Sequence, residues 1–175
     1  MTITLDHADL GKIKGSTVGS VAQFLGLKYA SLENRFATAS LLTEFNDDVT
    51  DATRFGEVIS NALYSAELTH GSPPPISPVG AVHGEFGFIQ HSLPLPDVPN
   101  HSDTEGLNLN ITVPLNGQSN IDPNARMPVY VFIHGGGFAV GSNWYPHYDP
   151  RKIVQLSLEK NKPMIGITIK YVCMR

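Results

Sequence analysis

The chain has 175 residues, of which 41% are hydrophobic and 16% are charged, and its formal net charge is −4. This length is sufficient for one domain with a hydrophobic core, and the hydrophobic fraction is typical of a folded chain. Since the net charge is negative and no run of basic residues occurs, the sequence predicts neither a nucleic-acid partner nor an anionic-membrane partner.

The N-terminal region and the cysteine content bear on localisation. Cys173 is the only cysteine, so no disulfide forms within the chain. Residues 1–15 lack the basic segment and the apolar segment of a signal peptide, and the sequence has no apolar run of about 18 residues. We therefore expect a cytoplasmic protein without a membrane span.

Residues 1–30 contain short β-type segments separated by glycines, which predicts a twisted antiparallel ribbon at the edge of a sheet. Residues 31–106 are irregular, with proline-rich stretches at 72–78 and 93–99 that disfavour helices and central strands. We expect a long surface excursion that packs partly on a core, because it carries four phenylalanines. These are Phe45, Phe55, Phe86 and Phe88.

Regular structure is predicted again from residue 107. In "LNLNITVP" (107–114), leucine, isoleucine and valine alternate with asparagine and threonine, the period of a half-buried strand. The continuously apolar "VYVFI" (129–133) predicts a strand covered on both faces, in the interior of the sheet.

A helix and a further strand are expected after residue 148. Asp149 can cap a helix that has Pro150 at its first position, and Lys160 marks the end of about eleven residues. "MIGITI" (164–169) predicts a second buried strand. Strand, glycine loop, helix and strand form a unit that is normally parallel and right-handed.

The loop between the strand at 129–133 and the helix contains consecutive glycines, and its spacing discriminates between ligands. A phosphate-binding loop needs lysine where Ser142 stands, and a dinucleotide fingerprint needs glycine where Val140 stands. What remains is the HGGG pattern, His134 to Gly137, whose backbone N–H groups can stabilise the oxyanion of an ester under attack. The alternative is a tight strand-to-helix turn without a ligand.

Several segments in this order resemble the N-terminal part of the type-B carboxylesterases, the family that includes cholinesterases. They are "GKIKG", "VAQFLGLKYA", "NRFATA", "EGLNLNITVP" and "PVYVFIHGGGF". The resemblance implies an α/β class: the N-terminal portion of an α/β-hydrolase fold with an incomplete sheet. Residues 1–175 would form the N-terminal part of a carboxylesterase domain, divided into an edge ribbon (1–30), an irregular excursion (31–106) and sheet strands with the oxyanion loop (107–175).

The resemblance also implies roles for individual residues. Gly136 and Gly137 would donate the loop N–H groups of an oxyanion hole, with Gly135 and His134 in support. Arg35 would form a structural ion pair with Glu105, the alternative being a solvated charge pair.

Other side chains near the loop allow more than one interpretation. Trp144 and Tyr145 either line an acyl or alcohol pocket or only pack beside the turn. His147 and Asp149 have no third ligand nearby, so we expect no metal, and no motif indicates a cofactor.

The sequence also departs from the family pattern. It contains no Gly-x-Ser-x-Gly motif, which in such esterases holds the nucleophile and precedes the acid and the histidine. We therefore expect no esterase turnover from these 175 residues and an unpaired edge on the strand at 129–133. Complete relatives would act on small-molecule esters; the alternative function is a non-catalytic interaction module, and the sequence indicates no particular protein partner.

Overall fold

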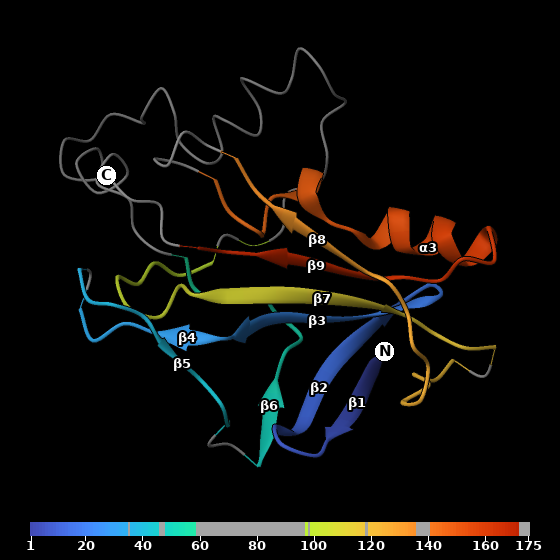
Figure 1. The fold of residues 1–175 in the computed structure, drawn as a ribbon, viewed down its shortest axis with the longest axis horizontal. Helices are drawn as coiled ribbons and strands as arrows, with labels where there is room; N and C mark the ends of the chain where they lie inside the picture. The colour runs from blue at the N-terminus through green and yellow to red at the C-terminus, as the bar shows by residue number, and fades with distance from the viewer. Residues whose placement is uncertain are drawn as a thin grey trace.

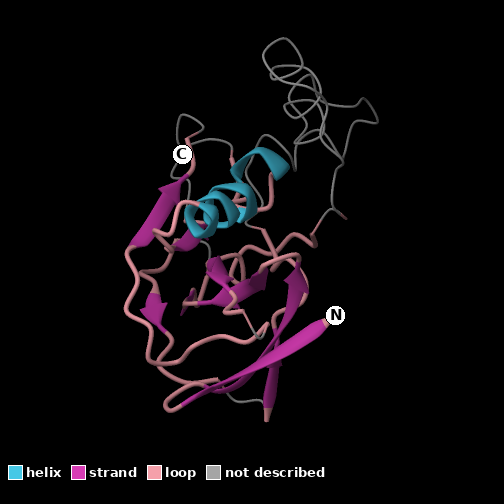
Figure 2. Ribbon diagram, turned by 90° about the vertical axis from the view of Figure 1, so that its right-hand side faces the viewer, coloured by secondary structure: helices cyan, strands magenta, loops and turns pink. Residues whose placement is uncertain are grey.

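The structure, a computed structural model, describes residues 1–34, 36–45, 48–58, 97, 99–117, 119–135 and 141–171. Most of this part of the chain belongs to one seven-stranded sheet with the order β1-β2-β3-β7-β9-β8, in which β6 pairs with β2 beside the main path (Figure 1). The single α-helix among the described residues, α3 (Arg151–Glu159), follows a short 3-10 helix, η2 (Pro146–Tyr148), and packs on one face of this sheet (Figure 2).

The expected N-terminal ribbon is confirmed. β1 (Thr2–His7), β2 (Gly11–Val18) and β3 (Val21–Lys28) pair antiparallel in sequence order. β3 contains a bulge between Phe24 and Leu27, where Gly26 has a φ of +68°. A Cβ at Gly26 would lie 2.3 Å from the Gly56 amide nitrogen, so glycine allows the two backbones to touch here.

The irregular excursion contains only short strands in its described parts. These are β4 (Ala30–Ser31), β5 (Ser40–Leu41) and β6 (Val49–Asp51). Phe45 packs on the main hydrophobic core and Phe55 packs on the cluster around Trp144, as the phenylalanine content predicted. Phe86 and Phe88 lie outside the described residues.

The later strands form the other half of the sheet. β7 (Asn108–Pro114) pairs antiparallel with β3 and with β9 (Ile165–Ile169), and β8 (Val129–Ile133) runs parallel to β9. The strand, loop, helix and strand between residues 129 and 169 thus form the parallel unit that the sequence predicts.

The predicted position of β8 in the interior of the sheet is wrong for this chain. β8 is the last strand in the sheet order, and Val129, Val131 and Ile133 are 53%, 49% and 62% exposed. Its continuous apolar sequence is typical of a doubly covered strand, but among the described residues no element covers its outer edge or this face. The expectation of an unpaired edge therefore holds in the described part of the chain.

α3 has nine residues rather than about eleven, and it begins one residue later than expected, with Pro150 as the N-cap and Arg151 as the first helical residue. The Asp149 carboxylate accepts a hydrogen bond from the Arg151 amide at 2.9 Å, which satisfies one of the free donors at the helix start. Val154 is fully buried, whereas Ile153 and Leu156 are 42% and 48% exposed. The helix therefore contacts the sheet along a narrow stripe only.

The two faces of the sheet differ in chemistry. On the face opposite α3, Phe24 packs with Ile13 and Leu27 in the main core cluster, and Leu109, Ile111 and Val113 lie against it, partly buried. On the face beneath α3, Asn108, Asn110 and Thr112 of β7 are at most 2% exposed. The polar side of the alternating β7 sequence is therefore the more deeply buried side.

Candidate functional site

The glycine loop begins at the end of β8, where His134 and Gly135 are described and Gly136 and Gly137 are not. The His134 ring is 2% exposed and stacks on Tyr171 with a centroid separation of 4.5 Å. Tyr171 Oη donates to the His134 carbonyl at 2.7 Å, and His134 Nδ1 lies 3.0 Å from the Gly135 carbonyl. The parallel neighbours β8 and β9 thus fix the entry to the loop.

Burial determines the protonation of His134. Desolvation lowers its pKa from 6.5 to about 4; the hydrogen bond to Gly135 raises it and the charge of Lys170 lowers it further. The imidazole is therefore neutral at pH 7, with the proton on Nδ1 directed at the Gly135 carbonyl. Its Nε2 is buried and has no hydrogen-bond partner among the described residues.

The far end of the loop returns to its beginning. Gly141 has a φ of +108°, and a Cβ there would lie 2.3 Å from the Gly135 oxygen and 2.4 Å from His134 Nδ1. Lys170 Nζ, on a residue directly after β9, donates to the Gly141 carbonyl at 2.6 Å. The residues on either side of positions 136–140 are therefore held against each other.

Of the predicted ion pair between Arg35 and Glu105, only Glu105 lies within the described residues. Arg35 lies outside them, and the Glu105 carboxylate pairs with Lys28 Nζ. Both side chains are partly exposed, so this pair contributes little to stability. Lys28 was not singled out from the sequence, because a single lysine in a β-type segment carries no pairing signal.

A buried polar network beneath α3 was also missed by sequence reasoning. Asn110 Oδ1 accepts from the Gly26 amide at 2.9 Å, and its Nδ2 donates to the Asn143 carbonyl and to Thr168 Oγ1. Asn143 Nδ2 in turn donates to Asn108 Oδ1 at 2.9 Å. The available signal was the alternating side of β7, which is polar but has no charged residue, as expected for a hydrogen-bonded interior.

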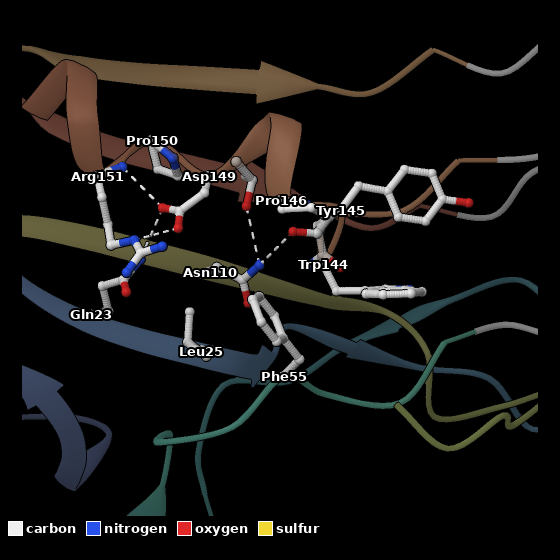
Figure 3. Close-up of a pocket in the computed structure, with 12 residues that line it drawn as sticks. Gln23, Leu25, Phe55, Asn110, Trp144, Tyr145, Pro146, Asp149, Pro150 and Arg151 are labelled. Carbon is white, nitrogen blue, oxygen red and sulfur yellow. Dashed lines mark hydrogen bonds and ion pairs between the residues drawn. The ribbon is translucent and has the colours of Figure 1, made fainter. Parts of the chain in front are cut away.

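Trp144 and Tyr145 are buried, and each packs against a neighbouring aromatic ring and also lines a cavity. Their rings meet edge to face at 5.1 Å, and Tyr145 stacks on Tyr148 at 5.8 Å. Both residues also line a cavity of about 210 Å³ between the sheet and the segment that leads into α3 (Figure 3). Packing and pocket lining are therefore not exclusive roles for these side chains.

Neither a metal cluster nor a membrane-spanning helix occurs in the described part of the chain. No group of three or more histidine, cysteine, aspartate or glutamate side chains is placed there to hold an ion. No helix among the same residues is long and apolar enough to cross a bilayer.

The sheet order, the parallel β8–α3–β9 unit and the antiparallel ribbon define an incomplete α/β-hydrolase fold. A solved structure titled PNB esterase shares this fold with a TM-score of 0.58 at 22% identity, covering 96% of this chain and 27% of that one. The family model described as "Carboxylesterase family" matches residues 3–171. The chain belongs to the carboxylesterase family.

Three curated relatives match between 71% and 98% of this chain. Lipase 3 of Yarrowia lipolytica is 32% identical over 166 residues, which cover 91% of this chain and 28% of that protein. Para-nitrobenzyl esterase of Bacillus subtilis is 28% identical over 174 residues, 98% of this chain and 28% of that protein. The inactive carboxylesterase-like protein VdtD of Byssochlamys spectabilis is 28% identical over 144 residues, 71% of this chain and 24% of that protein. The chain thus spans less than a third of the length of these relatives.

Proposed function

We propose that this chain supplies the oxyanion-binding part of a serine-type carboxylic-ester hydrolase. The backbone N–H groups of Gly136 and Gly137 would stabilise the oxyanion formed from a small-molecule ester, with His134 and Gly135 holding the loop entry. Donors already directed at that oxyanion need no reorganisation during the reaction, and each is worth about 3–4 kcal/mol.

The observation that carries this proposal is the pinned loop between β8 and α3. The His134 ring and the Gly135 carbonyl contact Gly141, so the intervening residues start and end at nearly the same point. Ser142 Oγ, a hydroxyl that can donate to an oxyanion, is buried next to Gly141 without a hydrogen-bond partner among the described residues. Buried polar groups of this kind are usually satisfied, which fits a loop that receives a polar ligand.

The same proposal places the nucleophile outside these 175 residues. The sequence has no Gly-x-Ser-x-Gly motif, so neither the serine nor its acid and base partners can be assigned within it. We expect the isolated chain to hydrolyse no p-nitrophenyl butyrate and to resist labelling by a fluorophosphonate. Hydrolysis that the phosphonate abolishes would contradict this part of the proposal.

The oxyanion role is tested in a chimera. The chain replaces the aligned segment of the B. subtilis para-nitrobenzyl esterase, whose remaining sequence supplies the other part of the fold. Gly136→Pro, which removes one N–H group, should lower kcat about 100- to 1000-fold, while prolonged incubation with the phosphonate still labels the serine, at a reduced rate because that reaction uses the same oxyanion hole. The matched control is Gly117→Pro, because Gly117 follows Asn116 in a turn closed by the Ser119 amide, a position where proline is favoured. Equal kcat values for the two variants would exclude the oxyanion role.

A second candidate function is a non-catalytic interaction module. It is favoured by the similarity to VdtD, a protein named as inactive. A chimera that folds but gains neither phosphonate labelling nor ester hydrolysis would support this candidate over the first.

A further inference from the structure

The cavity of about 210 Å³ beside α3 is a second binding-site candidate in the described part of the chain. Its floor consists of residues from β3, β7 and β9, and its roof consists of residues between 143 and 151 (Figure 3). Neither His134 nor Gly135 lines it. Apolar cavities of about 150 Å³ already bind benzene, so the volume suits one aromatic ring with a short substituent.

Most of the wall is apolar and part of it is aromatic. Phe55 closes one side below Asn110, and Trp144 extends beside it (Figure 3). Leu25, Pro146 and Pro150 complete the apolar surface. Flat apolar walls of this kind favour a planar ring, since paired aromatic rings attract each other beyond the effect of the area they bury.

The buried polar groups of the wall already have partners. Asn110 Nδ2 is bonded to Asn143 and Thr168, and Gln23 Nε2 donates to Asp149 at 3.1 Å. These groups are therefore fixed parts of the wall. They leave the polar anchoring of a ligand to another side chain.

Arg151 is that side chain. Asp149 accepts hydrogen bonds from both the amide and the Nε of Arg151, which fixes the guanidinium at one end of the cavity (Figure 3). The two terminal Nη groups make no hydrogen bond to a described residue. A guanidinium held through Nε still has donors for a second acceptor.

The charge balance of this end selects the kind of acceptor. Arg151 and Asp149 together are neutral, so a ligand carboxylate on Arg151 would also approach the Asp149 carboxylate and be repelled. An uncharged carbonyl oxygen avoids this repulsion. We propose that the cavity binds a small uncharged aromatic compound whose ring lies against Phe55 and Trp144 and whose carbonyl oxygen accepts a hydrogen bond from Arg151.

The test uses the single tryptophan of the chain. Trp144 gives one indole N–H cross-peak in a ¹⁵N-correlated NMR spectrum of the 175-residue protein, and its ring lines the cavity. The protein is titrated with acetophenone, with its anionic analogue benzoate and with ethylbenzene, which lacks the carbonyl. We expect a saturable shift of the indole peak, with acetophenone binding more tightly than either of the other two.

Variants separate the ring site from the carbonyl site. Leu25→Phe fills the cavity and should abolish the saturable shift. Arg151→Met should weaken acetophenone about tenfold, the usual effect of one charged hydrogen bond, and leave ethylbenzene unchanged. Lys152→Met is the matched control, because Lys152 is exposed on the same helix and does not line the cavity.

Several outcomes would overturn the proposal. They are a shift that does not saturate, tighter binding of benzoate than of acetophenone, and equal effects of Arg151→Met and Lys152→Met. If the Leu25→Phe variant does not give the dispersed NMR spectrum of a folded protein, the comparison of Arg151→Met with Lys152→Met still tests the proposal. No step depends on ester turnover, so the result is independent of the proposed function.

Discussion

His134 combines an ionisable ring with almost complete burial. Its position after β8 was predicted from the HGGG pattern, but its neutral state follows from its burial against Tyr171, which outweighs the hydrogen bond to the Gly135 carbonyl. The sequence shows an imidazole, whereas the pKa depends on how much water surrounds it. Protonation would place a positive charge on a ring that is almost completely buried.

This burial predicts an acid-sensitive fold. The pKa of His134 is about 4 in the folded chain and about 6.5 when unfolded, so the unfolded state binds the proton first. The contribution of His134 to stability is complete above pH 6.5, decreases below it, and is lost once the pH passes through about 4. Between pH 7 and pH 4.5 the loss should be roughly 2–3 kcal/mol.

Urea unfolding at both pH values measures this loss. His134→Gln keeps a polar side chain without a titrating group in this range. When the pH is lowered from 7 to 4.5, its free energy of unfolding should therefore decrease less than that of the wild type, and the difference between the two decreases should be roughly 2–3 kcal/mol. An equal decrease in the two proteins would show that His134 does not titrate on unfolding.

At the scale of elements, local sequence patterns predicted the ribbon, β7 and β9, and they predicted the start of α3 to within one residue. Each depends on neighbours in sequence, such as the alternation in 107–114 or Asp149 before Pro150. The position of β8 in the sheet depends instead on which strand lies beside it, and its apolar sequence predicted two covered faces. The buried polar face of β7 was not predicted for the same reason, because the segment 141–150 that covers it is distant in sequence.

The exposed β8 edge predicts self-association of the 175-residue chain. β8 has no charge, proline or bulge, the features that normally protect an edge strand. Val131→Lys places a charge at its centre and should raise the concentration at which the protein associates by about tenfold, a difference of about 1.4 kcal/mol.

Light scattering over a concentration series measures this shift. Val49→Lys is the control, because Val49 is 45% exposed, close to the 49% of Val131, but lies in β6 next to the ribbon. The same change in both variants would show that added charge in general, and not the β8 edge, controls association.

At the scale of the whole molecule, the polar network joins elements that the hydrophobic clusters leave separate. The main core cluster lies around β2 and β3, and a second cluster lies around Trp144 and Tyr145. Asn110 bonds to the Gly26 amide in β3, to the Asn143 carbonyl before α3 and to Thr168 in β9. One side chain in the central strand therefore connects the ribbon, the sheet and the segment that covers it.

This position predicts a large loss of stability when Asn110 is truncated. Asn110→Ala removes the partner of a partly buried amide, a buried carbonyl and a buried hydroxyl, and each group left without one costs about 1–3 kcal/mol unless water reaches it. We expect the free energy of unfolding in urea to decrease by about 3 kcal/mol with an unchanged m-value, since the whole described sheet depends on these bonds.

Asn124→Ala is the matched control: Asn124 is exposed, and the hydrogen bond it makes to Asp122 uses its backbone amide, so less than about 0.5 kcal/mol should be lost. If the two variants were equally stable, the hydrogen bonds of the Asn110 side chain would contribute nothing measurable beyond the backbone pairing and the apolar clusters.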